Sequence, residues 1–503
     1  MTPKRFFRRG RGFFLLVSAL GMLTGCAVGP DFRVPDAPIV KEYTPEPLPG
    51  ETVSASGRAG AAQRYAGGAD LPSQWWTLFR SEPLDHLIRK ALQDSPTIAA
   101  AQARLREAEE NLRARGGELL YPGLDGNFGV IRSRSTGASH GQPDSGATTF
   151  TLYNATLKIS YTLDLFGGNR RELEALRAQV DYQRFQLEAA HLALTSNIVT
   201  AAVREAALRA QIKAAREIVA MLDKQLELIR AKFELGGASM PDVLEQRTLL
   251  AQAMATLPPL EKELARTRHQ LAIYAGSFPG EGGIPEFILD ALVLPLELPI
   301  SLPSELVRRR PDIRAAEELL HAACARVGVA TANLYPKITL TGSLGSNGVK
   351  IEDLFSSGST VWSLGAGLLQ PLFHGGELTA KRRAAMAAYD QALAQYRDTV
   401  LAAFREVADT LRALEADARA LRAQADAEAS ARETLDLVEN QYRIGAVNYI
   451  SLLVAQRMYH EAQINLVQAR ANRFADTAAL FQAMGGGWWN GGGAGAADAP
   501  IKP

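Results

Sequence analysis

The chain has 503 residues, and its 55 lysines and arginines against 54 aspartates and glutamates give a formal net charge of +1. This balance gives no electrostatic reason to expect binding to nucleic acid. The length allows roughly two to four domains of ordinary size, and the two cysteines, Cys26 and Cys324, are too few for a disulfide framework.

The N-terminus has the pattern of a secretory signal peptide. A basic start at residues 4–11 is followed by the apolar run 13–23, which is too short to cross a membrane as a helix. The tetrad Leu23-Thr24-Gly25-Cys26 resembles the lipobox of bacterial lipoproteins. This likeness implies removal of residues 1–25 and a covalent lipid on Cys26, and Ala27 resembles the outer-membrane sorting signal. A chance cysteine near the cleavage site is the alternative.

The two halves of the chain repeat one pattern. Four landmarks occur in the same order in both halves, each displaced by roughly 210 residues. The pairs are Ser95-Pro96 and Arg310-Pro311, Tyr121-Pro122 and Tyr335-Pro336, Leu165-Phe166-Gly167-Gly168 and Leu372-Phe373-His374-Gly375-Gly376, and Leu235-Gly236 and Ile444-Gly445. We therefore expect two repeats with one architecture, at residues 81–275 and 303–484.

Each repeat is expected to contain a short helix and then a very long one. The short helix starts at Pro96 or Pro311, a residue suited to the first helical position, and runs to about residue 115 or 332. The long helix occupies residues 169–235 or 377–444, which lack Gly and Pro and are rich in Ala, Leu, Glu, Arg and Gln. At 1.5 Å per residue each would extend roughly 100 Å, so we expect coiled-coil packing or an elongated assembly.

Glycines mark the end of each long helix. Gly236-Gly237 and Gly445 are helix-stop signals, and a second helix is expected to return over residues 241–275 or 448–483. Pro258-Pro259 interrupt the first of these, where we expect a kink or a break. Each repeat should thus supply a helical hairpin.

Four segments between the helices alternate between apolar and polar side chains: residues 151–165 and, more weakly, 124–132, 338–344 and 362–368. This alternation is typical of a transmembrane β-strand, although a half-buried strand of a soluble sheet has the same pattern. The polar loops 133–148 and 346–360 resemble long extracellular loops and favour the membrane. Four strands cannot close a barrel, so several copies must; two copies would leave a filled interior, whereas three would leave room for water.

Five short motifs carry a family resemblance. They are Cys-Ala-Val-Gly-Pro-Asp-Phe (26–32), Trp-Trp-Thr-Leu-Phe (75–79), Arg-Arg-Pro-Asp-Ile (309–313), Asn-Leu-Tyr-Pro (333–336) and Gln-Pro-Leu-Phe (370–373). Together they resemble the lipoprotein branch, of the NodT type, of the TolC-type outer-membrane efflux channel family. The likeness implies an α+β fold with two internal structural repeats: a periplasmic helical barrel and a transmembrane β-barrel, completed by trimerisation with four strands from each protomer. It also implies an equatorial region formed by residues 26–80 and by the linker 276–302.

The same resemblance implies a passive function and two kinds of partner. An inner-membrane efflux transporter supplies energy, and a periplasmic membrane-fusion adaptor protein docks on the helical tips of the homotrimer. The adaptor-contact residues would be Gly236, Gly237, Arg443, Ile444 and Gly445. The lipid on Cys26 would be the only attached group, with no other cofactor and no metal.

The family often closes the periplasmic tip with an apolar ring and an acidic ring, and here the second departs from the pattern. Ile450 occupies the apolar position, but Val454 stands where the family has an aspartate. Asp242 and Glu245 in the first repeat could supply the acidic ring, because three carboxylates close together would attract cations. Equally, they could simply favour a helix N-terminus.

Other functions have weaker support. Residues 137–141 match the hydrolase G-x-S-x-G motif, but in a polar loop, and the seven histidines lack metal-ligand spacing, so we expect no enzyme. The alternatives are a channel for type I secretion or aromatic-acid export, and a structural coiled-coil lipoprotein. Cys324 is expected to be a buried small side chain, and the Gly-rich tail 485–503 to be disordered.

Overall fold

The computed structural model describes residues 27–40, 42–136 and 146–490, and divides into two compact units. The sheet unit contains residues 1–35, 105–183 and 316–396, and the hairpin unit contains residues 36–104, 184–315 and 397–503. Both units therefore take segments from both predicted repeats. The predicted signal peptide and Cys26 lie outside the described residues.

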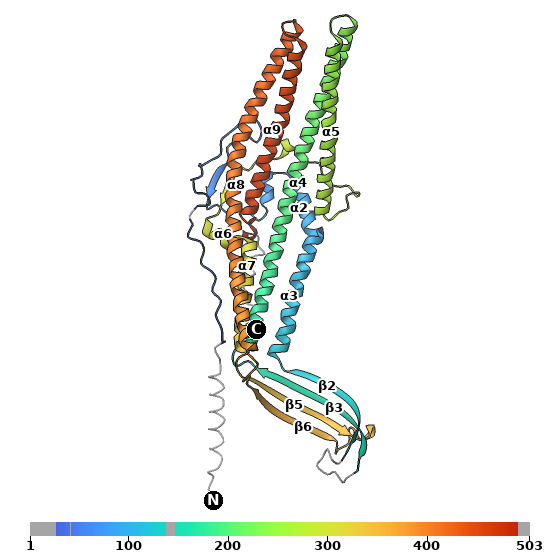
Figure 1. Ribbon diagram of the computed structural model, residues 1–503, viewed down its shortest axis with the longest axis vertical. Helices are drawn as coiled ribbons and strands as arrows, with labels where there is room; N and C mark the ends of the chain where they lie inside the picture. The colour runs from blue at the N-terminus through green and yellow to red at the C-terminus, as the bar shows by residue number, and fades with distance from the viewer. Residues whose placement is uncertain (1–26, 41, 137–145, 491–503) are drawn as a thin grey trace. The chain divides into compact units, whose positions relative to one another are not determined.

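Both predicted long helices are confirmed. α4 (Gly168–Glu234) and α8 (Glu377–Arg443) have 67 residues each. A returning helix follows each of them, α5 (Met240–Tyr274) after α4 and α9 (Tyr449–Ala483) after α8. In the hairpin unit, α5 runs back along α4 and α9 runs back along α8 (Figure 1).

The buried side of α8 shows why so long a helix is stable. Its apolar residues recur at alternating intervals of four and three and are at most 5% exposed: Val407, Leu411, Leu414, Ala418, Leu421 and Ala425. This spacing is the 3.5-residue repeat of a coiled coil, which keeps one apolar seam against a neighbouring helix. One such neighbour is α9, whose Leu466 and Ala469 pack in the same cluster as Leu421 and Ala425.

Of the kink or break expected at Pro258-Pro259, the break is wrong, because α5 continues through both prolines. A proline inside a helix removes the hydrogen bond to the carbonyl four residues earlier, here that of Met254 or Ala255. All four of these residues are exposed. Water can therefore satisfy the two carbonyls, and the helix continues without its internal bonds at this point.

The four predicted strands form one antiparallel sheet in the sheet unit. Its order is β2 (Gly123–Ser135), β3 (Thr148–Leu163), β5 (Lys337–Gly348) and β6 (Thr360–Leu369). Each repeat supplies one strand hairpin, and β3 pairs with β5 where the two hairpins meet. The short helices α3 (Pro96–Leu120) and α7 (Pro311–Ala332) precede β2 and β5, and η4 (Ile351–Asp353) lies between β5 and β6.

The hairpin unit contains a second, small sheet that the sequence did not predict. β1 (Arg64–Gly67) pairs in parallel with β4 (Glu297–Ile300), so the predicted linker 276–302 supplies a strand. The same unit holds η1 (Trp75–Phe79), α2 (Glu82–Asp94), η3 (Leu289–Ala291) and α6 (Pro303–Arg309). In its core, the rings of Trp75 and Phe79 both pack edge-on against Phe481 of α9.

The tail is ordered for longer than expected. The prediction of disorder from Gly485 is wrong for residues 485–490, which end in η5 (Trp488–Asn490). The indole of Trp488 donates a hydrogen bond to the Arg309 carbonyl at 2.7 Å, and Asn490 donates one to the Leu71 carbonyl at 2.8 Å. These contacts offset the conformational entropy that the glycines lose when the segment is ordered. Residues 491–503 lie outside the described part of the chain.

Candidate functional site

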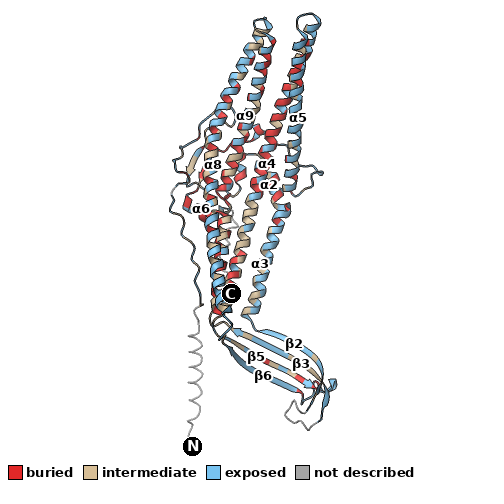
Figure 2. Ribbon diagram, viewed as in Figure 1, coloured by how far each residue is buried: buried red, intermediate tan, exposed pale blue. Residues whose placement is uncertain are grey.

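One face of the four-stranded sheet is apolar and exposed. A row of paired residues crosses it from Leu157 through Leu344 to Trp362, which are 52%, 57% and 71% exposed. Residues paired across strands point to the same side, so their neighbours on this face include Leu124, Ile159 and Leu364. Figure 2 shows the strands mostly in the colour of exposed residues. Soluble proteins seldom expose so continuous an apolar surface, so this face suits lipid.

The opposite face is polar. Alternate rows carry residues that pair as Asp125 with Lys158, Lys158 with Ser343, and Ser343 with Ser363. The hydroxyls of Ser343 and Ser363 lie 2.8 Å apart. A sheet with lipid-compatible side chains on one face and polar side chains on the other is typical of transmembrane strands that surround water.

The strands are long enough to cross a membrane, but the sheet is open. They have 13, 16, 12 and 10 residues, against the about 9–11 that a tilted strand needs. Within the described part of the chain, β2 and β6 each pair on one side only. Because unpaired backbone groups are too costly in hydrocarbon, these edges require strands from other copies.

The remaining sequence-based candidates concern helices, metals and catalysis. Across the described ranges, no helix combines the length and the apolar character needed to cross a membrane. In the same ranges, no group of His, Cys, Asp and Glu could hold a metal ion. The hydrolase-like motif at 137–141 lies outside them. Cys324 is buried, as predicted, and its thiol donates to the Pro30 carbonyl at 3.7 Å.

The two helical tips have the same backbone turn. Gly236 and Gly445 have φ of +76° and +78°, a left-handed conformation that favours glycine. The next residue in each tip donates a hydrogen bond back to the carbonyl five positions earlier, Gly237 to Lys232 at 2.7 Å and Ala446 to Gln441 at 2.8 Å. This is the Schellman motif, so both predicted helix stops are confirmed.

The returning helices begin with side-chain caps that differ between the repeats. In α5, the Ser239 backbone N–H and hydroxyl both donate to the Asp242 carboxylate, at 2.8 and 2.7 Å. These bonds hold the pKa of Asp242 below its ordinary value, so the carboxylate stays charged. In α9, Asn448 accepts from the Ser451 backbone instead. Asp242 thus stabilises a helix start.

The predicted constriction residues lie at the starts of α5 and α9. Ile450 and Val454 are one turn apart on one exposed side of α9, 54% and 42% exposed. Glu245 is exposed on α5, one turn after the cap. Burial, then Tyr442 and the negative charges of Asp242 and Glu245, raise the pKa of Tyr449. Both acids therefore lie near Tyr449, the residue before Ile450.

Contacts between the two hairpins near the tips were not predicted. Lys232 donates a hydrogen bond to the Tyr442 hydroxyl at 3.3 Å, which links α4 to α8. Tyr449 donates to the side-chain oxygen of Gln246, whose nitrogen donates to the Leu222 carbonyl at 2.8 Å, which links α9 through α5 to α4. The sequence contains one signal for these contacts. An aromatic residue lies three positions before each glycine stop, Phe233 in the first repeat and Tyr442 in the second.

Two buried polar side chains of α9 have no hydrogen-bond partner among the residues that the structure describes. Gln456 is fully buried and His460 is 8% exposed, one turn further along. Both amide atoms of Gln456 and both ring nitrogens of His460 are without a partner. Burial lowers the pKa of His460 to about 4, so its ring is neutral at pH 7. No sequence pattern marked this histidine beyond its lack of metal-ligand spacing.

A family profile described as "Outer membrane efflux protein" matches residues 87–277 and 302–486. The pyoverdine export outer membrane protein OpmQ of Pseudomonas aeruginosa is 34% identical over 457 residues, which cover 88% of this chain and 94% of OpmQ. The probable outer membrane lipoprotein SilC of Salmonella typhimurium is 27% identical, with 94% of this chain and 98% of SilC covered. The solved structure of the outer-membrane channel OprN is 29% identical with a TM-score of 0.82, covering 92% of this chain and all of that one.

Proposed function

The chain belongs to the outer membrane efflux protein family, and from this premise we propose how three copies of it work as the exit channel of a tripartite efflux pump. It is an outer-membrane channel component for the efflux of small molecules. Transport through it is passive, because an inner-membrane transporter supplies the energy and a periplasmic adaptor connects the two. It performs no catalysis and needs no cofactor.

The single observation that carries the proposal is the two-faced sheet with open edges. Its apolar face, crossed by Leu157, Leu344 and Trp362, suits lipid, and its polar face suits a water-filled passage. Three copies of a four-stranded sheet close a twelve-stranded barrel. The alternative, a structural coiled-coil lipoprotein, does not account for such a sheet.

The helical tips have the character of a protein-binding surface. Ile444, just before the glycine stop of the second repeat, is 80% exposed, and Leu235 at the same place in the first is 88% exposed. Apolar side chains at the end of a long hairpin favour contact with a partner. We assign adaptor contact to Gly236, Gly237, Arg443, Ile444 and Gly445, and the constriction to Ile450 and Val454.

A lipid on Cys26 would anchor the chain beside its own sheet. The support is the Leu-Thr-Gly-Cys tetrad, together with the similarity to SilC, a probable outer membrane lipoprotein. Attachment of acyl chains through the cysteine would add membrane affinity in proportion to the number of buried methylene groups.

The proposal is tested by mass measurement and conductance of the purified protein. We expect a trimer in detergent and stepwise ion conductance in planar bilayers. A monomer that leaves bilayers electrically silent would overturn the proposal.

A matched pair of substitutions tests the two faces of the sheet. Leu344→Lys puts a charge on the apolar face, where it costs about 2–4 kcal/mol near the middle of the membrane. Ser343→Lys puts the same charge on the polar face of the same strand. We expect loss of assembled channels in the outer membrane for Leu344→Lys and normal assembly with altered ion selectivity for Ser343→Lys. Equal effects of the two would contradict the assignment of the faces.

A further inference from the structure

The segment 27–32, directly after the proposed lipidation site, is bound to the rest of the sheet unit along its length. The Val28 backbone N–H donates to the Phe166 carbonyl at 3.0 Å, just beyond the end of β3. The Cys324 thiol of α7 donates to the Pro30 carbonyl at 3.7 Å. The Phe32 ring stacks on the His321 ring, with centroids 4.3 Å apart and planes at 13°.

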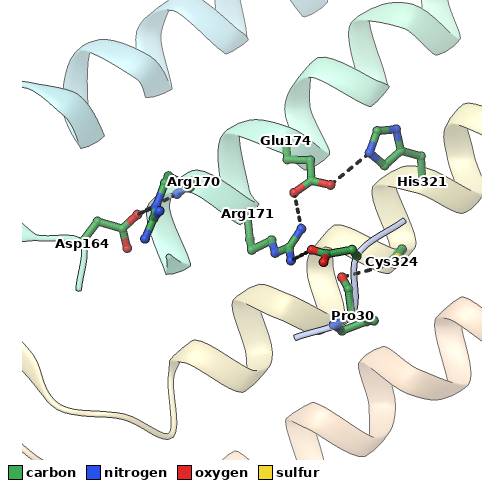
Figure 3. A network of polar contacts seen from close by, with 8 residues as sticks. Pro30, Asp164, Arg170, Arg171, Glu174, His321 and Cys324 are labelled. Atoms are coloured by element: carbon green, nitrogen blue, oxygen red, sulfur yellow. Dashed lines mark hydrogen bonds and ion pairs between the residues drawn. The ribbon is translucent and has the colours of Figure 1, made fainter. Parts of the chain in front are cut away.

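A chain of alternating charges holds the same segment. Arg171 of α4 is 5% exposed and donates to Asp31 of the segment and, at 2.7 Å, to Glu174. Glu174 contacts His321 at 3.1 Å (Figure 3). Hydrogen bonds to Glu318 and Glu174 raise the pKa of His321, although burial opposes this effect. The raised pKa favours an imidazolium ring between the two acids.

The backbone also approaches α7 as closely as glycine allows. A Cβ built on Gly29 would lie 2.5 Å from the Cα of Gly328, a distance that no side chain could accept. Gly29 has φ of +101°, so a larger residue would be strained there as well. The fit between the segment and α7 therefore depends on glycine at position 29, whereas a Cβ on Gly328 would lie 2.7 Å from Cγ of the Arg171 side chain.

We propose that residues 27–32 are an N-terminal strap that joins the two repeats at the base of the sheet. α4 follows β3 in the first repeat, and α7 precedes β5 in the second, while β3 and β5 are the strands at which the two repeats pair. The strap contacts both helices through Arg171, His321 and Cys324. It thereby holds α4 of the first repeat and α7 of the second together through a third segment of the same chain.

The strap would also position the lipid, a consequence that rests on the proposed lipidation of Cys26. That cysteine precedes Val28 by two positions, and two residues of chain reach at most about 7 Å. The anchor would therefore stay beside the end of β3. If residues 27–32 were not bound, the lipid would be attached to an unanchored segment, and its acyl chains would not be held beside the sheet.

Cys324 provides a direct measure of strap binding. It is buried under the Pro30 carbonyl, and burial raises the pKa of its thiol, so the folded protein should react slowly with a maleimide. Cys26 is the only other cysteine of the chain. The experiment is the labelling rate of each cysteine in the full-length trimer in detergent, read by peptide mass spectrometry at pH 7.

Asp31→Ala removes the ion pair with Arg171, and Phe32→Ala removes the ring stacked on His321. Both substitutions are in the strap itself and leave α4 and α7 unchanged. We expect each to speed labelling of Cys324 by about tenfold, the effect of losing one charge-assisted hydrogen bond or its equivalent in packing. The matched controls are Arg33→Ala, at the exposed next position, and Arg170→Ala, whose side chain pairs with Asp164 at 3.3 Å and not with the strap (Figure 3). Both should label at the wild-type rate.

Labelling of Cys324 that is fast in the wild type, or unchanged in both strap variants, would overturn the strap. Labelling that speeds equally in the controls would also overturn it, because the effect would then be general loosening. Labelling of Cys26 is a separate result: a free thiol there would contradict the lipid anchor of the proposed function, while the Cys324 rates would still decide the strap.

Discussion

Acidification from pH 7 to pH 5 should loosen α9 around His460. The ring nitrogens of this histidine are buried without partners, and burial lowers its pKa from 6.5 to about 4. The packed helix therefore holds a neutral ring, whereas a locally opened helix exposes the ring to water, where it can take a proton. A lowered pKa in the packed state means that the stabilising contribution is complete above about pH 6.5 and is lost as the pH falls toward 4.

The size of the effect follows from the two pKa values. At pH 5 the opened state binds nearly one proton more than the packed state. Local opening should become easier by about 2 kcal/mol, or roughly twentyfold. Asp476, further along α9, has a raised pKa, so its effect on stability changes with pH in the opposite direction, and a measurement confined to the residues near His460 is needed.

Hydrogen–deuterium exchange of residues 452–468, corrected for the intrinsic effect of pH, measures this opening. His460→Leu fills the site with an apolar side chain and should abolish the acid-induced rise in exchange. His269→Leu, at an exposed position on α5, is the matched control and should leave the rise intact. An equal rise in His460→Leu and wild type would refute the reasoning, because the proton would then be binding elsewhere.

Three further predictions concern the constriction and the acidic pair. Ile450→Ser should raise single-channel conductance and antibiotic leakage, and unchanged conductance would place the apolar ring elsewhere. Glu245→Gln should weaken cation selectivity, measured as the reversal potential in a salt gradient, if the first repeat supplies the acidic ring; an unchanged potential would exclude that role. Burial and Asp417 raise the pKa of Asp476 to about 7, so Asp476→Asn should raise the unfolding temperature at pH 8 more than at pH 5, and an equal rise would contradict this coupling.

The parts of the fold that could be predicted depend on signals repeated along one segment. Residues 169–235 and 377–444 lack helix breakers throughout, so the ends of α4 and α8 were placed within one residue. The alternation in 151–165 likewise located β3, which in fact begins three residues earlier, at Thr148. Such patterns are local, and each residue in the segment adds to the same inference.

The parts that could not be predicted depend on single contacts between distant segments. Arg473 of α9 is fully buried, and it donates to the carbonyls of Ala59 and Ala61 and to the side chains of Thr52 and Gln63. All four acceptors are neutral, and all lie more than 400 residues earlier in the chain. Neither Arg473 nor its acceptors belong to a periodic pattern. For this reason the sequence did not predict the contacts between residues 52–63 and α9, or those made by the strap.

The duplication explains why the tips share a backbone but differ in chemistry. The Schellman turn depends on one glycine in a left-handed conformation, and both repeats keep it, at Gly236 and Gly445. Side chains on the following helix are free to differ once the turn is fixed, and at the place of Glu245 the second repeat has Val454. One repeat thus presents a carboxylate where the other presents an apolar side chain. Three copies would bring both kinds of hairpin to the opening. The first repeat can then supply the charged side chains of the opening, and the second repeat the apolar side chains that close it.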